Sequence, residues 1–233
     1  STVCRKLWTM ITRAVKSATA VIRAPTETAV IRGKLEQTRQ TDPIAELQLS
    51  DKTPLSDIEQ RLNKEKANRT AVQAKLSGTE EQLDTESNRP AAARDRISEA
   101  AQRRDALSTQ LQLEPPAGET AELSEARRWD MASEDAMLEA EIRMLDQELL
   151  SQPVRIELLK AKRDKDTLSL ERIDARIQVL ETMLGGKRLA EAQQAIAEAE
   201  TAKREARGKH RLVQQLAEQN AALSADVGSV AAQ

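Results

Sequence analysis

A mostly apolar stripe between residues 138 and 184, with no slip in register, constrains the fold of this chain more than any other feature. Apolar side chains recur there on an alternating three- and four-residue spacing, and the polar residues on the same spacing are Gln152, Arg163 and Asp166. A repeat of 3.5 residues places all these positions on one narrow face of a long helix, so that helix must lie along a partner helix. The apolar residues of the stripe, called the central seam below, are Leu138, Ile142, Leu145, Leu149, Ile156, Leu159, Leu170, Ile173, Ile177, Leu180 and Leu184.

The composition favours long, solvated helices over a thick globular core. The chain has no Phe and no Tyr, only two Trp, and 32% of its residues are charged. Helices that pack through narrow stripes need few large side chains, whereas a compact interior needs many. We therefore expect an all-α fold of long antiparallel coiled-coil helices, elongated in shape.

The segment 114–118, Glu-Pro-Pro-Ala-Gly, is the strongest turn signal in the sequence. It separates two helical arms of nearly equal length, which predicts an antiparallel hairpin. Pro90 in the first arm and Pro153 in the second should kink their helices, because proline removes a backbone hydrogen bond and its ring clashes with the preceding turn. Since the central seam keeps its register across Pro153, we expect a bend there and not a new domain.

Proline and glycine signals divide the chain into five segments. These are a basic N-terminal segment (1–25), a short helix and linker (26–50), a first long helical arm (51–113), a second helical arm (119–184) and an Ala-rich third arm (187–226). The apolar spacing shifts by one residue after Gly185-Gly186, so the third arm either continues the second helix or folds back at the glycines. We favour a continuation to about Lys209.

Near the end of the chain the three- and four-residue spacing is carried by larger side chains. The positions are Val213, Leu216, Asn220, Leu223, Val227 and Val230. An Asn on such a stripe could set the register or the oligomeric state of a coiled coil. The alternative is a solvated Asn near a helix end.

The charge distribution gives no sign of a nucleic-acid partner. The net charge is only −2, so no global field attracts a polyanion. The first 25 residues are basic and carry an amphipathic face that could contact a membrane surface; a poorly ordered tail or a remnant of export processing is the alternative. The residues of that face are Leu7, Ile11, Ala14, Ala18 and Ile22.

Residues typical of catalytic or metal sites are scarce. His210 is the one histidine, and no Glu precedes it at the spacing of a carboxylate–histidine metal site. We expect it on an exposed helix surface, and we interpret Glu134, Asp135 and Glu139 as a solvated acidic face. The sequence therefore predicts a protein that is not an enzyme, with no catalytic, cofactor-binding or metal site and no cofactor.

Several blocks of the second arm together resemble a known family. They are Ala126–Ala132 (ARRWDMA), Leu138–Ile142 (LEAEI), Leu145–Leu150 (LDQELL), Leu158–Asp164 (LLKAKRD), Leu180–Leu184 (LETML) and Lys187-Arg188. In this order they resemble the extracytoplasmic, porin-type helical region of large MscS-like mechanosensitive channels of the MscK (KefA) type. The resemblance covers roughly residues 27–222 and is clearest over 121–206.

The resemblance implies a non-catalytic extracytoplasmic module that spaces or modulates the pore of a large mechanosensitive channel in osmotic protection. It implies a location on the periplasmic side of the bacterial inner membrane. The implied partners are the remainder of the channel chain, with transmembrane helices beyond Gln233, and identical subunits in a homo-oligomer, typically a heptamer. An alternative is a periplasmic adaptor or scaffold hairpin that docks a partner through the 114–118 tip.

Overall fold

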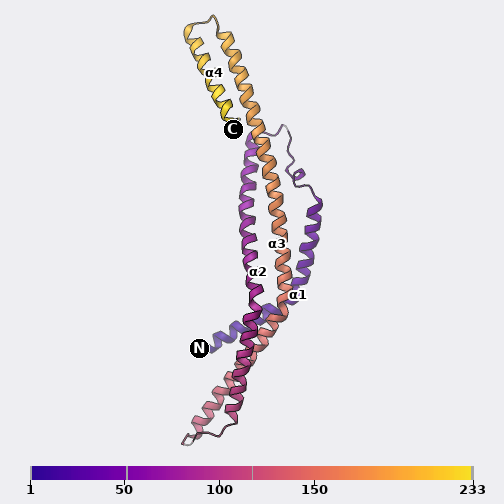
Figure 1. Cartoon of the computed structure of the whole chain (residues 1–233), viewed down its shortest axis with the longest axis vertical. Helices are drawn as coiled ribbons and strands as arrows, with labels where there is room; N and C mark the ends of the chain where they lie inside the picture. Colours follow the sequence, from indigo (N-terminus) through magenta and orange to yellow (C-terminus); the bar gives the residue numbers. More distant parts are fainter. Residues whose placement is uncertain (1, 51, 117, 232–233) are drawn as a thin grey trace. The chain divides into compact units, whose positions relative to one another are not determined.

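The computed structural model describes residues 2–50, 52–116 and 118–231 (Figure 1). In this part of the chain there are four α-helices, one short 3-10 turn and no strands. The elements are α1 (Thr2–Gln40), the 3-10 turn η1 (Ala45–Leu47), α2 (Leu55–Gln112), α3 (Ala121–Ala206) and α4 (Arg211–Ala231). The expected all-α, antiparallel helical fold is confirmed. None of these helices is both long enough and apolar enough to cross a membrane.

The described chain forms two compact units. Unit 1 combines the residues up to Arg39 with Ala74–Thr167, and unit 2 combines Gln40–Gln73 with the residues from Leu168 onward. Helices α2 and α3 each contribute to both units. Unit 1 contains the connection between α2 and α3, and unit 2 contains η1 and α4.

Two glycines in the left-handed conformation mark the connections on either side of α3. Gly118 has φ +89° and Gly208 has φ +88°, a region that residues with a Cβ atom rarely adopt. Thr120 then begins α3, since its hydroxyl accepts a hydrogen bond from the Leu123 N–H at 3.4 Å. Ala117, inside the expected turn, lies outside the described residues.

The helix boundaries differ from the expected segments at two places: α1 continues through Pro25, and the expected third arm (187–226) is divided at Gly208, between α3 and α4. The favoured continuation of the second helix is confirmed, because α3 runs through Gly185 and Gly186 to Ala206. A helical glycine costs only about 1 kcal/mol relative to alanine, which is too little to interrupt an 86-residue helix that is packed along its length. After α3 the chain folds back at Gly208, between α3 and α4.

In unit 1, α2 and α3 pack through small apolar clusters. One cluster is formed by Ala93, Met144 and Leu145, and a second by Ala100, Leu107 and Leu138. The cluster with the earlier α2 residue, Ala93, contains the later α3 residues, and the cluster with the later α2 residues contains the earlier α3 residue, Leu138. This inverse order is that of an antiparallel pair. The narrow clusters are what a coiled-coil seam with few large side chains produces.

In unit 2, the core lies where η1 meets α2 and α3. Leu47 of η1 packs with Ile58 and Leu62 of α2 and with Leu180 and Leu184 of α3. Ile58 and Leu180 are fully buried. A single turn of 3-10 helix thereby covers the end of the α2–α3 pair in this unit.

Most side chains before Ser17 lie outside the described set. The expected membrane-facing stripe of the N-terminal segment therefore lies largely outside it as well. Ala18 and Ile22 are described, and both are exposed.

Candidate functional site

A regular series of ion pairs connects α2 to α3 in unit 1. Three arginines on α2, spaced seven residues apart, each contact a glutamate on α3, and these glutamates are also seven residues apart. The pairs, called the charge ladder below, are Arg89–Glu148 at 2.6 Å, Arg96–Glu141 at 2.8 Å and Arg103–Glu134 at 2.8 Å. Equal steps on both helices mean that one fixed antiparallel register serves all three pairs.

The hydrogen bonds of the charge ladder are two-pronged. Arg96 donates from Nε to Glu141 Oε1 and from Nη2 to Glu141 Oε2, both at 2.8 Å. Arg103 holds Glu134 in the same way, at 2.8 and 2.9 Å. Such bidentate pairs fix the relative position of the two helices more tightly than a single contact does.

The ion pairs also shift proton affinities. The hydrogen bond from Arg103 holds the pKa of Glu134 below its ordinary value of 4.5. The hydrogen bond from Arg104 lowers the pKa of Asp135 in the same way. Arg104 contacts Glu139 as well, at 3.2 Å. Glu134, Asp135 and Glu139 keep about a third of their side-chain surface exposed, and all three also pair with arginines of α2, which the interpretation as a solvated acidic face did not include.

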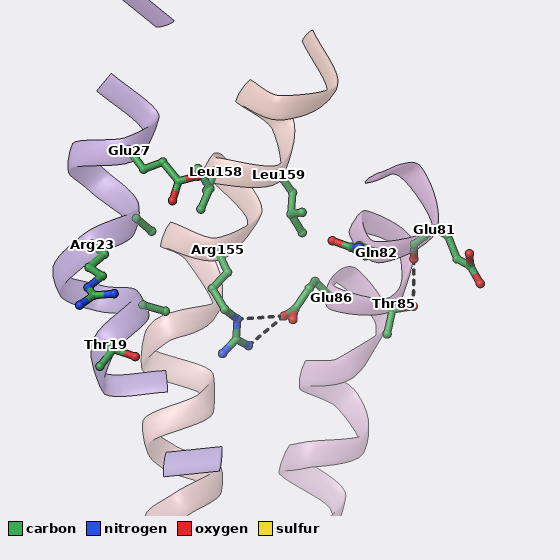
Figure 2. Close-up of a pocket in the computed structure, with 12 residues that line it drawn as sticks. Thr19, Arg23, Glu27, Glu81, Gln82, Thr85, Glu86, Arg155, Leu158 and Leu159 are labelled. Carbon is green, nitrogen blue, oxygen red and sulfur yellow. Dashed lines mark hydrogen bonds and ion pairs between the residues drawn. The ribbon is translucent and has the colours of Figure 1, made fainter. Parts of the chain in front are cut away.

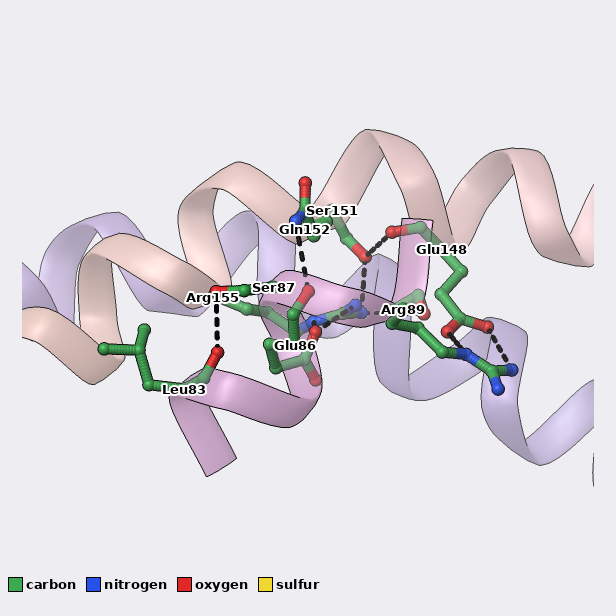
Figure 3. A network of polar contacts seen from close by, with 9 residues as sticks. Leu83, Glu86, Ser87, Arg89, Glu148, Ser151, Gln152 and Arg155 are labelled. Atoms are coloured by element: carbon green, nitrogen blue, oxygen red, sulfur yellow. Dashed lines mark hydrogen bonds and ion pairs between the residues drawn. The ribbon is translucent and has the colours of Figure 1, made fainter. Parts of the chain in front are cut away.

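Beside the charge ladder, proline interrupts the helical hydrogen bonding at a place called the proline site below, which is formed by Pro90, Glu86 and Gln152. Pro90 has no N–H, so the backbone carbonyl of Glu86, four residues earlier, has no helical donor. The side-chain amide of Gln152 donates to that carbonyl at 3.1 Å (Figure 3). Gln152 is one of the three polar residues on the spacing of the central seam, and its polarity has a structural reason.

A buried polar network continues from this site toward α1. The Ser151 side chain is fully buried, and its hydroxyl donates to the Glu148 carbonyl at 2.9 Å. Arg155 donates to the Ser151 hydroxyl at 2.7 Å, to the Ser17 hydroxyl of α1 at 3.4 Å and to Glu86 Oε2 at 2.8 Å. Figure 3 shows these side chains converging between α2 and α3. Arg155 thereby joins α1, α2 and α3 at one level.

The same arginine lies on the wall of a groove of about 650 Å³ between the three helices of unit 1. Figure 2 shows Arg155 pointing toward Glu86 across the groove. Glu27, on the α1 side, pairs with Lys162 at 3.0 Å. Leu158 and Leu159 supply apolar surface. The groove lies between the packed helices, and its lining includes no His, Cys or Ser side chain.

In unit 2, arginines of α3 hold the connection that leads from α1 to α2. Arg172 is buried and donates to the Thr41 carbonyl and to Glu46, both at 2.7 Å. Arg176 contacts Glu46 at 3.0 Å and Glu65 of α2 at 3.1 Å. Glu46, the residue before Leu47, is thus held by two arginines one helical turn apart.

The structure places the central-seam residues as follows. Buried are Leu138, Leu145, Ile173, Leu180 and Leu184, and partly buried are Ile142, Leu149, Ile156, Leu159, Leu170 and Ile177. Five of them, Leu138, Ile142, Leu145, Leu149 and Ile156, lie in the part of α3 that carries the charge ladder and the proline site. Their function as a seam for a partner helix stays a prediction.

The charge ladder is not among the features predicted from the sequence, although a signal for it exists. Basic residues recur every seven positions in the first arm and acidic residues every seven in the second. Reflecting the two arms about the 114–118 turn brings these positions opposite each other. His210 was expected on a helix surface, but it precedes α4 and its Nδ1 accepts a hydrogen bond from the Leu212 N–H at 3.3 Å.

The residues that the structure describes offer no metal site, since no three His, Cys, Asp or Glu side chains come together. What the site does provide is a defined helix register, set by bidentate ion pairs, next to a proline interruption that a side-chain amide repairs. These are properties of a structural element that holds helices at a fixed position.

Comparison with known proteins identifies the family. The model of the mechanosensitive ion channel porin domain matches residues 12–215. No curated protein and no solved structure matches the chain. The matched range includes the charge ladder, the proline site and most of α1 and α3. The chain belongs to the mechanosensitive ion channel porin domain family.

Proposed function

We propose that this chain is a non-catalytic, extracytoplasmic module that spaces or modulates the pore of a large mechanosensitive channel in osmotic protection. The family match supports an association with such a channel. The observation that carries the mechanical part of the proposal is the charge ladder, because it holds two long helices in one register over two heptads. A module of this kind acts through its geometry and not through bond chemistry.

The mechanical role follows from how the α2–α3 contacts are built. The apolar clusters between the two helices are small, so they define the register less strongly than a wide core would. A slide of one heptad would bring two of the three arginines opposite the next glutamate and would place the third opposite Arg127 or Arg155. The proline site, where Gln152 meets the Glu86 carbonyl, has no equivalent seven residues away. The ion pairs and this single site together define one register.

We further propose that the module lies on the periplasmic side of the bacterial inner membrane. Its proposed partners are the remainder of its own channel chain and identical subunits. The near-neutral charge supports a protein partner over nucleic acid. No described helix could itself span the bilayer.

The proposal is tested in the complete channel by reversing one pair of the charge ladder. Arg96→Glu should shift the tension at which the channel opens in patch recordings and should reduce survival after osmotic downshock. Adding Glu141→Arg should restore both, because the swapped pair keeps the same register. As a matched control, reversing Glu36 and Arg39, an exposed pair within one turn of α1, should change neither. Unchanged gating in Arg96→Glu would contradict the proposal.

A second candidate, a scaffold hairpin that docks a partner through its tip, is favoured by two exposed apolar side chains near the α2–α3 connection. Leu113 and Leu123 are largely exposed there. Replacing both with Ser distinguishes the candidates: loss of osmotic protection from this change, with no effect of the Arg96→Glu reversal, would favour the scaffold.

A further inference from the structure

Helix α4 exposes the apolar stripe that the sequence predicts for it. The largest side chains of the stripe are all mostly exposed. The exposed fractions are 66% for Leu216, 64% for Leu223, 60% for Val227 and 70% for Val230. Val213 and Asn220, on the same stripe, are exposed as well. A helix in a soluble protein normally turns such a stripe toward its core.

The face of α4 that packs on α3 lies beside the stripe, and Val227 and Val230 also line a groove with Ala192 and Ala195 of α3. Ala221 is buried, and Gly228 allows so close an approach that a Cβ atom there would lie 2.5 Å from Ile196 Cδ1. Around a helix with 100° per residue, Leu216, Leu223 and Val230 lie about 140–180° from Ala221, and Val213, Asn220 and Val227 lie about 80–120° from it. The small-residue face is used within the chain, and the stripe beside it keeps most of its surface exposed.

The order of residues on the stripe is specific. Val213, Asn220 and Val227 occupy one core position of the heptad, and Leu216, Leu223 and Val230 occupy the other. β-Branched residues at the first position with leucine at the second favour two parallel strands. A single Asn at the first position fixes register and a two-stranded state, at some cost in stability.

We propose that the exposed stripe of α4, defined by Val213, Leu216, Asn220, Leu223, Val227 and Val230, pairs in parallel with the same stripe of a second copy of this chain. Asn220 of one copy then lies opposite Asn220 of the other and shares its side-chain hydrogen bond. An antiparallel pairing would place Asn220 against a leucine and leave its amide unpaired in an apolar layer. The proposal uses residues of unit 2 alone and does not depend on the proposed function.

Flanking residues allow this pairing. In a parallel pair, residues on either side of the stripe face residues of the other copy. Gln219 of one copy faces Ser224 of the other, and Asp226 faces Ala231. Neither pairing brings like charges together. The α3 helix packs against Ala221 and Gly228 and borders the stripe at Val227 and Val230, whose side chains are still 60% and 70% exposed.

The area of the stripe sets the strength of the contact. At about 100 Å² for a fully exposed Leu or Val side chain, five side chains at the measured exposures offer roughly 300 Å² per copy. Because about 60% of an interface is apolar, two copies would bury on the order of 1,000 Å² in total. This is the lower limit for a specific interface. The pairing is therefore reversible and weak, with an expected dissociation constant of about 10 μM to 1 mM.

Sedimentation of the 233-residue chain over that concentration range tests the proposal. The expected result is a monomer–dimer equilibrium. Replacing both Leu216 and Leu223 with Glu should weaken it at least about tenfold without loss of helicity, because both side chains are already exposed in the single chain. Leu150→Glu, at an equally exposed leucine of α3, is the matched control and should leave the equilibrium unchanged. A chain that stays monomeric, or a dimer that tolerates the double change, would overturn the proposal.

Cross-linking tests the direction of the pairing. In a Cys4→Ser background, Val227→Cys should form a disulfide-linked dimer under oxidation, because parallel strands bring residue 227 opposite its own copy. In an antiparallel pair the two residues would be about 16 Å apart along the helix and would not link. Asn220→Val should strengthen association and broaden it to larger oligomers. Dimerisation without a link through residue 227 would refute the parallel arrangement.

Discussion

The contact between Gln152 and the proline site allows a sharp test of how this protein keeps a continuous helix through Pro90. Gln152→Met removes the amide donor and keeps an unbranched side chain of similar length and similar helix propensity. The Glu86 carbonyl then loses the hydrogen bond that it receives at 3.1 Å. A partly buried acceptor left without a donor costs about 1–3 kcal/mol, and because the site is only partly buried we expect a loss near 1 kcal/mol.

The second arm of the test restores the missing donor in the backbone. In Pro90→Ala the new alanine has an N–H that can donate to Glu86 in the ordinary helical pattern, so Gln152 becomes redundant. This variant alone should be more stable than the parent chain by up to about 3 kcal/mol, the difference between Pro and Ala in a helix interior. In the Pro90→Ala background, Gln152→Met should cost less than about 0.3 kcal/mol.

Urea unfolding of the four chains, followed by helical circular dichroism, measures the coupling between the two positions. The account predicts a coupling free energy of roughly 1 kcal/mol, well above the additivity error for independent sites. An equal cost of Gln152→Met in both backgrounds would refute the reasoning. It would mean that Gln152 stabilises the protein through its packing alone.

Three further outcomes follow from the ion pairs. Arg96→Glu should destabilise the chain by about 1 kcal/mol, and adding Glu141→Arg should recover most of that loss. Thermal melts of the single and double variants measure both effects. Additive losses would argue against a direct pair. The folded-state pKa of Glu134 lies below 4.5, so its pairing contributes stability above that pH, and this contribution is lost as the pH falls through the lower folded pKa. Melting temperatures measured from pH 6 to 3 should therefore fall less steeply in Arg103→Gln than in the parent, and identical profiles would refute the assignment. Glu46→Gln should weaken the contacts that Arg172 and Arg176 of α3 make with residue 46, and proteolysis within 41–54 should become faster. An unchanged cleavage rate would show that the packing of Leu47 alone fixes this connection.

Much of the helical pairing could be predicted because it depends on local rules. The 3.5-residue spacing that begins at Leu138 predicts a long helix with one apolar face, and the prolines and glycine at 114–118 predict where the chain reverses. The structure shows α2 and α3 as the antiparallel arms of that hairpin. These signals need no knowledge of distant residues.

The helix boundaries were harder to predict, because proline and glycine act through their surroundings. Pro25 lies inside a continuous helix, whereas Gly208 adopts a positive φ and ends the run within the expected third arm. Continuation through Gly185-Gly186, which the apolar spacing favoured, is confirmed. The local cost of a helix breaker is a few kcal/mol at most, and contacts elsewhere along the helix decide whether it is tolerated. Sequence spacing alone does not contain that information.

The candidate site depended on register, which sequence patterns specify only in combination. Arg96 and Glu141 are individually ordinary surface residues, and their pairing follows only from the turn position and the antiparallel direction together. Gln152 looked like an interruption of the central seam. Its role became evident once α2 brought the Pro90 break to the same level.

The central claim is that α2 and α3 of unit 1 run antiparallel in one fixed register. In a Cys4→Ser background, Arg96→Cys combined with Glu141→Cys places two thiols opposite each other, and a short bismaleimide should link them within the chain. Arg96→Cys combined with Glu134→Cys displaces the second thiol by seven residues, about 10 Å along the helix, and should not link. Equal linking of both pairs would show that the helices slide and would contradict the account.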